Sequence, residues 1–333
     1  MAKIMVMGAG GWGTALGLMA HRYGHDVTLW SPFMEEIEQI RRDQEHKKLL
    51  PGVPIPQTLG LTTDLNEAAG ADLVIMAVPS FAVEDTACGL RGILTADTVI
   101  ANAGKGLQEG TLQRFSQVIK EAVPQCPVVV LSGPSHAEEV ARGVPTTVVS
   151  ASQQMDAAEM VQQWLMNPRF RIYVNPDVIG VELGGALKNV IALAAGIVDG
   201  MQLGDNTKAA LMTRGLAEMA RLGTAMGAKS ETFAGLSGMG DLVVTCGSMH
   251  SRNRRAGILI GQGFSAEEAV KQVGTVEGYL AARAAWQLAR RAGVDMPIVE
   301  QCYCICYEGR PAREAIEALM TRPKRLESDY SWR

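Results

Sequence analysis

The chain has 333 residues, with 31 lysines and arginines against 35 aspartates and glutamates, so its formal net charge is −4 at pH 7. This length is enough for one large or two ordinary domains with a substantial core. Hydrophobic residues make up 47% and charged residues 20% of the chain, values that argue against a disordered chain or a coiled coil. A mildly acidic chain is also a poor general binder of nucleic acid, so no nucleic-acid partner is expected.

Composition also bears on the compartment. The N-terminal segment has too short an apolar run for a signal peptide, and no stretch is expected to supply the roughly 20 apolar residues that span a bilayer. Six cysteines in a chain of this size do not indicate the disulfide framework of a small secreted domain, so we expect the protein to reside in a reducing cytoplasm. Cys302, Cys304 and Cys306 invite a metal interpretation, but in an expected helix their two-residue spacing points them to different faces. Core packing is favoured, and no metal site is expected.

Strand-like runs and helical stretches alternate in the first half of the chain. Several runs consist of Val, Ile, Leu and Met without polar alternation, as expected of parallel strands that are covered on both faces. We expect strands at Lys3–Met7, Val27–Trp30, Leu73–Val78, Thr98–Ala101, Val128–Ser132, Thr146–Ser150 and Arg171–Val174, and helices at Gly13–Tyr23, Glu35–Arg42 and Thr111–Ala122. This alternation predicts an α/β fold with a Rossmann-like doubly wound sheet.

The pattern changes at about residue 181, where Ala/Leu/Met-rich amphipathic stretches take over. Helices are expected at Val181–Val198, Thr207–Met226, Ala266–Val273, Gly278–Arg291, Pro297–Tyr307 and Ala312–Met320. We therefore predict a Rossmann-like domain over residues 1–180 and an all-α domain over residues 181–333. A homodimer through these helices is left open, because the domain's own core explains an apolar helix face equally well.

A glycine-rich segment follows the first expected strand and opens the first expected helix: Gly8-Ala9-Gly10-Gly11-Trp12-Gly13. A G-x-G-x-x-G sequence alone is weak evidence, but a strand before it and a helix after it are the context that supports dinucleotide binding. Glycines let the backbone approach a pyrophosphate, whose charge is met by free N–H groups at the helix N-terminus. The alternative, a merely tight turn, is less favoured in this context.

The ends of the next strands supply further candidates. The second strand ends without the Asp or Glu that usually binds ribose hydroxyls and without an Arg for a 2′-phosphate, so the choice between NAD and NADP stays open. Ser31 is a ribose candidate or an ordinary loop opening. Pro79, and Lys105 between two glycines, follow later strands, where ligands of such sheets bind. Lys105 is the first cation placed to meet a phosphate or a carbonyl, although an isolated lysine is often only a solvated charge.

The helical half contains one cation in a long apolar run, Lys188. A lysine desolvated there should have a lowered pKa, which makes it a usable proton donor and acceptor near neutrality. The alternative is a lysine that reaches solvent from a helix edge. Further along, Asp241 and Thr245 share a face if their segment is helical. The following Ser251–Arg255 segment concentrates guanidinium and amide donors of the kind that bind a dianionic phosphate.

Taken together, these motifs resemble the NAD(P)-dependent glycerol-3-phosphate dehydrogenases of the bacterial type. Eight segments occur in that family's order over nearly the whole chain, which is far more specific than any one of them. The matching segments are Gly8 to Ala15, Lys105-Gly106-Leu107, Ser132 to Ala137, Leu187 to Val190, Gly240-Asp241-Leu242, Ser251 to Arg255, Val276-Glu277-Gly278 and Tyr307-Glu308-Gly309.

The resemblance implies reversible reduction of dihydroxyacetone phosphate to sn-glycerol 3-phosphate by NADH or NADPH in the cytoplasm, feeding phospholipid synthesis. It makes Lys188 the proton donor and acceptor, and it places Lys105 beside substrate and cofactor. Catalytic residues would be Lys188, Lys105, Asp241 and Thr245. Substrate would contact Lys105, Gly133, Ser135, Asp241, Ser251, Arg252 and Asn253, with Arg252 and Asn253 on the phosphate. Cofactor would contact Gly8, Gly10, Gly11, Trp12, Gly13, Ser31, Pro79, Lys105, Ala137, Arg252 and Glu277.

Two alternative functions remain open. A 6-phosphogluconate or β-hydroxyacid dehydrogenase also pairs a dinucleotide domain with an all-α domain and uses a helix lysine. A non-catalytic dinucleotide sensor would bind cofactor without turnover, and the presence of Lys105, Lys188 and Arg252 together argues against it.

The chain lacks the basic residue that many bacterial members of the family carry after the second strand, where it has Ser31-Pro32-Phe33.

Overall fold

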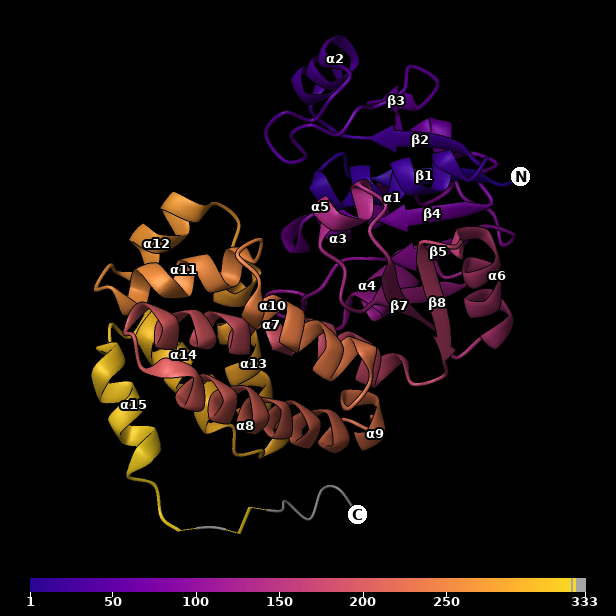
Figure 1. Cartoon of the computed structure of the whole chain (residues 1–333). Helices are drawn as coiled ribbons and strands as arrows, with labels where there is room; N and C mark the ends of the chain where they lie inside the picture. Colours follow the sequence, from indigo (N-terminus) through magenta and orange to yellow (C-terminus); the bar gives the residue numbers. More distant parts are fainter. Residues whose placement is uncertain (325, 328–333) are drawn as a thin grey trace. The chain divides into compact units, whose positions relative to one another are not determined.

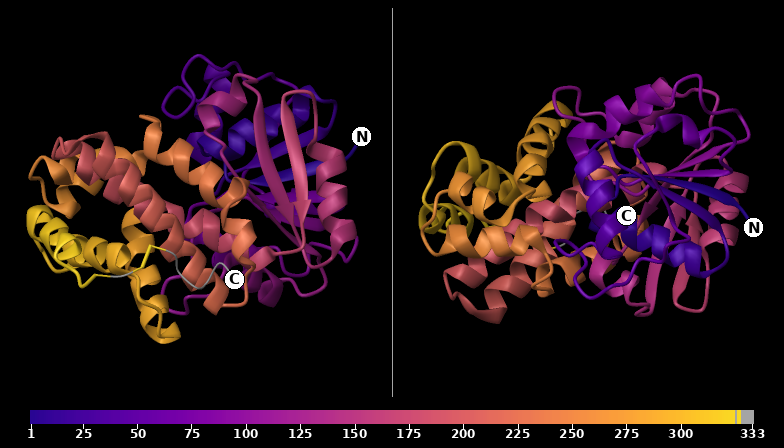
Figure 2. Two further views of the ribbon diagram at one scale, coloured as in Figure 1. Left: turned by 60° about the horizontal axis from the view of Figure 1, so that its bottom comes forward. Right: turned by 90° about the horizontal axis from the view of Figure 1, so that it is seen from above.

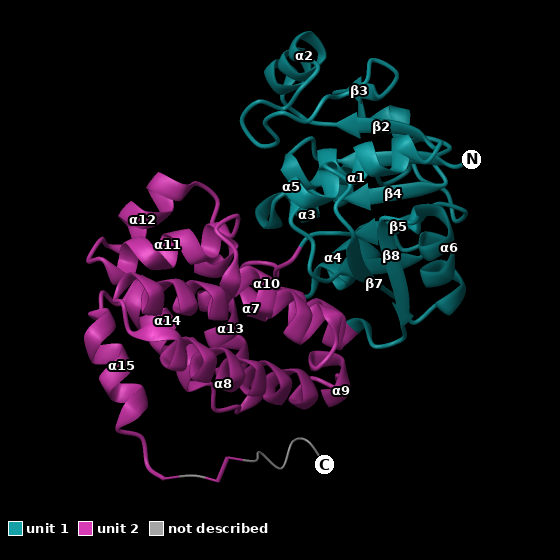
Figure 3. Cartoon of the chain, viewed as in Figure 1, with its two compact units in different colours: residues 1–104, 113–178 teal, residues 105–112, 179–333 magenta. Residues whose placement is uncertain are grey.

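The computed structural model describes residues 1–324, 326 and 327 (Figure 1). These residues form two compact units (Figure 3): unit 1 contains residues 1–104 and 113–178, and unit 2 contains residues 105–112 together with the chain from residue 179 onward. The predicted domains, 1–180 and 181–333, stay a prediction. The units divide the chain after residue 178 and assign the short segment 105–112 to unit 2.

Unit 1 is built on an eight-stranded sheet in the order β3-β2-β1-β4-β5-β6-β7-β8. Neighbouring strands are parallel except β6 and β7, and β7 and β8 are seen side by side in Figure 2. The strands are β1 (Lys3–Met7), β2 (Asp26–Trp30), β3 (Gly60–Thr62), β4 (Leu73–Met76), β5 (Val99–Asn102), β6 (Val128–Ser132), β7 (Thr146–Ala151) and β8 (Phe170–Asn175). The predicted Rossmann-like sheet is confirmed. Strand β3 was not predicted, because three residues are too few for a recognisable pattern.

Alternate residues of β1 show that both faces of this sheet are covered. Ile4 and Val6 belong to one apolar cluster, whereas Met5 and Met7 belong to another. The helices of unit 1 are α1 (Gly11–Arg22), α2 (Met34–Asp43), α3 (Val83–Gly89), α4 (Phe115–Ala122), α5 (Ala137–Ala141) and α6 (Met155–Leu165). The predicted helix at Thr111–Ala122 was too long at its start, because Leu112 has a left-handed backbone (φ 63°) that a helix does not allow.

The described residues of unit 2 contain helices and no strand, which confirms the predicted all-α half. The helices are α7 (Val178–Gly200), α8 (Gly204–Ala225), α9 (Ser230–Phe233), α10 (Asp241–Gly247), α11 (Arg252–Gly261), α12 (Ala266–Val273), α13 (Glu277–Ala292), α14 (Pro297–Tyr307) and α15 (Ala312–Met320), with a π turn, η3 (Leu236–Gly240), before α10. Ser265 and Glu268 form a capping box at the start of α12.

One described helix, α7, is long and apolar enough to cross a membrane by length and composition alone, and most of its apolar window is buried inside the protein. The expectation that no stretch approaches this length was therefore wrong. Buried residues line α7 on every side, which is typical of the central helix of a globular core.

Helices α7 and α11 pack with their backbones in direct contact through glycines. A Cβ on Gly196 would lie 2.1 Å from the carbonyl oxygen of Arg254, and one on Gly257 would lie 2.1 Å from that of Leu193. Gly200 and Gly261 face the opposite helix in the same way. No side chain fits between the two helices, so the glycines set the distance between them.

Gly257→Ala is therefore expected to lower the free energy of unfolding by about 1–3 kcal/mol, because the two backbones must separate to admit one methyl group. Urea denaturation of the purified variant measures the change. Gly247→Ala is the matched control, since a Cβ there meets nothing within 4 Å. Equal stability of the Gly257 variant and the control would contradict the close packing of α7 and α11.

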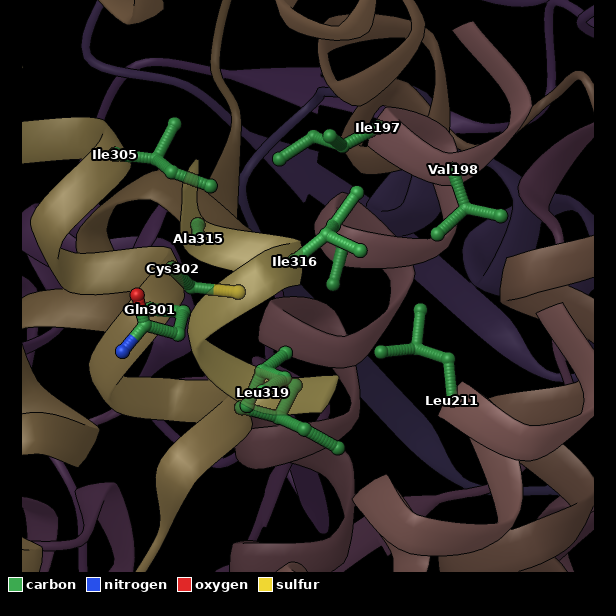
Figure 4. Close-up of a pocket in the computed structure, with 11 residues that line it drawn as sticks. Ile197, Val198, Leu211, Gln301, Cys302, Ile305, Ala315, Ile316 and Leu319 are labelled. Atoms are coloured by element: carbon green, nitrogen blue, oxygen red, sulfur yellow. The ribbon is translucent and has the colours of Figure 1, made fainter. Parts of the chain in front are cut away.

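The three clustered cysteines lie on α14. Cys302, Cys304 and Cys306 are buried and free, which confirms core packing for them. Burial raises the pKa of the Cys306 thiol to about 12. Cys302 lines a small apolar cavity of about 40 Å³ between α7, α8, α14 and α15, and Figure 4 shows it with Leu211 and Leu319. Within the described part of the chain, no cluster of three or more His, Cys, Asp or Glu residues is placed to hold a metal ion.

Candidate active site

The glycine-rich segment forms the turn from β1 into α1. Gly8 has φ +113°, and a Cβ there would lie 2.9 Å from the carbonyl oxygen of Ala77. A Cβ on Gly13 would lie 2.0 Å from the carbonyl oxygen of Gly8, so both positions require glycine. By contrast, a Cβ on Gly10 meets nothing within 4 Å, which leaves one side of the turn open.

Helix α1 begins at Gly11, and its N-cap residue Gly10 supplies no side-chain cap. The first N–H groups of α1 therefore have no side-chain acceptor at the cap, as expected where a phosphate is bound. Trp12 is fixed by its indole N–H, which donates to the carbonyl oxygen of Ala103 at 3.2 Å. A Cβ on Gly11 would lie 3.9 Å from the Cβ of Ala137, so these two predicted cofactor residues are neighbours. The backbone geometry fits a dinucleotide.

Ser31 is buried at the end of β2, and its hydroxyl donates to Oε2 of Glu36 at 2.5 Å. A hydrogen bond with His46, opposed by burial and aided by Ser31, holds the pKa of Glu36 below its usual value. Sequence reasoning missed Glu36, because the carboxylate comes from the first turn of α2 and not from the strand end. A carboxylate near this strand end is typical of binding to ribose hydroxyls.

The other predicted residues of unit 1 also follow strands. Pro79 lies three residues after the end of β4 and is the N-cap of a short 3₁₀ turn (Ser80–Ala82). Gly133 directly follows β6, has φ +141°, and has no room for a side chain, because a Cβ would lie 3.0 Å from the Cα of Val148. Ser135 donates from its hydroxyl to the carbonyl oxygen of Gly133 at 2.9 Å. Both loops follow the ends of strands, as the sequence predicted.

Unit 2 contains a cluster of charged side chains around one carboxylate, Asp241. Lys105 Nζ lies 2.6 Å from Asp241 Oδ2, and Lys188 Nζ lies 3.1 Å from Asp241 Oδ1. Lys188 also donates to the hydroxyl of Thr245 at 2.7 Å. That hydroxyl donates in turn to the main-chain carbonyl oxygen of Asp241 at 2.6 Å. The four predicted catalytic residues are therefore connected through Asp241 into one cluster.

Local structure explains how these four residues meet. Lys188 projects from the middle of the buried helix α7, and its side chain is 7% exposed. Asp241 and Thr245 lie one turn apart on α10, on one helix face as predicted, and the side chain of Asp241 is 2% exposed. Lys105 comes from the segment 105–112, which belongs to unit 2 although the chain on both sides of it belongs to unit 1.

Burial sets the ionisation of this cluster. Burial lowers the pKa of Lys188 to about 8; the positive charge of Lys105 lowers it too, and the carboxylate of Asp241 opposes both. Burial would raise the pKa of Asp241, but the two ammonium groups hold it below its usual value. Two ammonium groups and one carboxylate leave a net positive charge, which suits a substrate oxygen that gains negative charge.

A hydrogen-bonded chain of amides lies at the start of α11. The N-cap residue Ser251 accepts from the main-chain N–H of Arg254 at 3.2 Å. Asn253 is buried; its amide group donates to Oδ1 of Asn189 at 2.9 Å and accepts from the main-chain N–H of Gly278 at 2.8 Å. Asn189 was missed as a site residue, although it directly follows Lys188 in the sequence. Gly278 follows Glu277, the first residue of α13, so this predicted cofactor residue lies beside the chain of amides.

The remaining predicted residue of unit 2, Arg252, is the exposed first residue of α11. The predicted residues are thus divided between the two units. Unit 1 contains Gly8, Gly10, Gly11, Trp12, Gly13, Ser31, Pro79, Gly133, Ser135 and Ala137, and unit 2 contains Lys105, Lys188, Asp241, Thr245, Ser251, Arg252, Asn253 and Glu277. Their roles toward cofactor and substrate stay predictions.

Comparison with known proteins identifies the family of the chain. Residues 3–158 match the family described as NAD-dependent glycerol-3-phosphate dehydrogenase N-terminus, and residues 177–317 match the corresponding C-terminus. The chain is 52% identical over 328 residues to a glycerol-3-phosphate dehydrogenase [NAD(P)+] of Desulfitobacterium hafniense, covering 98% of this chain and 93% of the relative. A relative of the same name from Moorella thermoacetica is 54% identical over 325 residues, 97% of this chain and 96% of its own.

A solved structure gives the same result. The crystal structure of glycerol-3-phosphate dehydrogenase from Coxiella burnetii is similar with a TM-score of 0.93 and 39% sequence identity, over 96% of this chain and 99% of that one. Two family models together span most of the chain, and relatives about half identical to it align over nearly its full length. Both comparisons identify the same family. The chain belongs to the NAD-dependent glycerol-3-phosphate dehydrogenase family.

Proposed function

We propose that the protein reversibly reduces dihydroxyacetone phosphate to sn-glycerol 3-phosphate with NADH or NADPH. The observation that carries this proposal is the contact of Lys188 and Lys105 with the single carboxylate of Asp241 in a chain of this family. The product is a precursor of glycerophospholipids, and the proposed cellular role is to supply this precursor for their synthesis. All six cysteines are free thiols, which supports a reducing cytoplasm as the location.

The residues that would hold the cofactor lie in the turn of Gly8, Gly10 and Gly13, whose close backbone contacts and open side fit a dinucleotide. When bound, the reduced nicotinamide supplies a hydride. Glu36 beside Ser31 favours NADH, because a carboxylate can accept hydrogen bonds from ribose hydroxyls and repels a 2′-phosphate.

Lys188 would supply the proton. With a pKa of about 8, its Nζ is largely an ammonium at pH 7 and can donate to the oxygen on C2 of the substrate as that oxygen gains negative charge. In the reverse direction the neutral amine accepts the hydroxyl proton. Asp241 and Thr245 hold Nζ in place, and Lys105 shares the same carboxylate and adds positive potential.

The phosphate of the substrate would bind at the start of α11, where Arg252, Asn253 and the N-cap Ser251 lie together. Gly133 and Ser135 of unit 1 are the further proposed substrate residues. Binding of a group remote from the reacting carbon holds the carbonyl in place for reaction.

Arg252→Ala should raise the KM for dihydroxyacetone phosphate by roughly 10- to 100-fold, because a charged hydrogen bond to the phosphate is worth about 1.5–3 kcal/mol. Steady-state kinetics with varied substrate at saturating cofactor measures the change. Arg313→Ala, which removes an exposed arginine of α15 outside the Ser251–Arg255 segment, is the control. An unchanged KM in the Arg252 variant would remove this residue from the phosphate site.

The activity itself is tested by the loss of nicotinamide absorbance when purified protein is mixed with dihydroxyacetone phosphate and either NADH or NADPH. We expect turnover, with the larger kcat/KM for NADH. Oxidation of 3-hydroxyacids or 6-phosphogluconate in place of this activity would favour the related dehydrogenases. Cofactor binding without turnover on any of these compounds would favour a sensor.

The proposed partners are this small phosphorylated substrate and a second copy of the chain. Light scattering of the purified protein distinguishes a monomer of 35.6 kDa from a homodimer of twice that mass. A monomer at assay concentration would remove the homodimer without affecting the activity.

A further inference from the structure

Arg254 belongs to the basic segment that the sequence associates with phosphate binding, but its side chain points to other acceptors. Its Nε donates to Oδ2 of Asp199 at 2.7 Å, and its Nη1 donates to the carbonyl oxygen of Gly247 at 2.8 Å. The side chain is only 16% exposed. Because two acceptors on different segments hold its planar guanidinium, the orientation of Arg254 is fixed before any ligand binds.

Asp199 lies near the end of α7 and accepts from a second cation. Lys208 on α8 donates to the same Oδ2 at 2.8 Å. Burial would raise the pKa of Asp199, but Lys208 and Arg254 hold it below its usual value. An exposed ion pair contributes little to structure. The Asp199–Arg254 ion pair is different, because both side chains are mostly buried and Arg254 also donates a hydrogen bond to Gly247 on a third segment.

The segments joined by Arg254 are those that carry the proposed catalytic groups. Asp199 is on α7, eleven residues after Lys188. Gly247 is the last residue of α10, which carries Asp241 and Thr245. Arg254 itself is the third residue of α11, directly after Arg252 and Asn253. The direct backbone contact of Gly196 with the carbonyl of Arg254 places α11 against α7 at the same point.

We infer that Arg254, held by Asp199, is a positioning residue that fixes the phosphate-binding start of α11 relative to the helix of Lys188. This inference rests on the proposed function. Arg254 does not bind the phosphate itself. It sets where Arg252 and Asn253 hold the phosphate, and through the phosphate it sets where the carbonyl of the substrate lies with respect to Lys188 Nζ.

The test compares Arg254→Gln, Asp199→Asn and the double variant with the wild-type protein. Each single variant should raise the KM for dihydroxyacetone phosphate roughly tenfold, because small displacements of a binding group are costly. The inhibition constant of inorganic phosphate, measured against dihydroxyacetone phosphate, should rise in the same proportion. The double variant should resemble Arg254→Gln, because the two residues act as one unit.

Arg313→Gln is the control, since it removes an exposed arginine of α15, outside the Ser251–Arg255 segment, and should leave both constants unchanged. Arg254→Lys keeps the charge but cannot hold both acceptors, so its KM should be intermediate. A purely structural role would instead lower the melting temperature, with the KM for dihydroxyacetone phosphate and the inhibition constant unmoved, and that result would overturn the inference. Absence of wild-type turnover would overturn the proposed function and this inference together.

Discussion

Lys188→Ala should lower kcat for reduction of dihydroxyacetone phosphate by roughly 10²- to 10⁴-fold, the contribution of a positioned general acid. The loss follows from the position of Lys188 Nζ, which is buried and hydrogen-bonded to Thr245. Stopped-flow measurement of a single turnover isolates the chemical step from product release.

The cofactor affinity of this variant serves as its control. Lys188 is on α7 in unit 2, whereas the glycine turn is in unit 1, so NADH should bind with nearly the wild-type dissociation constant. Lys188→Met preserves the length of the side chain in the buried helix and should show the same loss of kcat without a cavity. Near wild-type turnover in either variant would remove Lys188 from the proton transfer.

Asp241→Asn should lower the free energy of unfolding by about 3–5 kcal/mol, because it leaves two ammonium groups in a buried site without their counter-charge. Lys188 and Lys105 both contact the carboxylate that is lost. The same change removes the interaction that raises the pKa of Lys188, so this pKa should fall below about 8. Reduction at pH 7 should slow as the ammonium form is depleted.

Urea denaturation measures the stability of this variant, and Asp295→Asn is its control. Asp295 forms an ion pair with Arg322 in which both side chains are substantially exposed, so its loss should cost less than about 1 kcal/mol. If the two variants were equally stable, the charged cluster would not be the buried, coupled unit that the geometry describes.

The sequence predicted the alternation of strands and helices because that signal is local. Apolar runs such as Leu73–Met76 identify themselves as buried strands, and the glycine turn identifies the first strand and helix. The short strand β3 and the true start of α4 could not be predicted. The first depends on pairing with β2, and the second on the left-handed backbone of Leu112.

The candidate site was predictable where one residue stands out from its neighbours. Lys188 is conspicuous in an apolar helix, and the spacing of Asp241 and Thr245 indicates a shared face. Glu36 and the pairing of Arg254 with Asp199 were not predictable, because these contacts join residues brought together only by folding. A basic segment such as Ser251–Arg255 shows that cations are present but not which of them bind a ligand and which hold the helices together.

The dependence of kcat/KM on pH, measured in both directions, tests whether Lys188 transfers the proton, because it reports the ionisation of the free enzyme. Reduction requires Lys188 as the ammonium, so its rate should fall as pH rises through about 8. Oxidation of glycerol 3-phosphate requires the neutral amine, so its rate should rise over the same range. Two opposite limbs that meet near pH 8 are the predicted result. Profiles that run in parallel, or that show no ionisation between pH 7 and pH 9, would contradict Lys188 as the proton donor and acceptor.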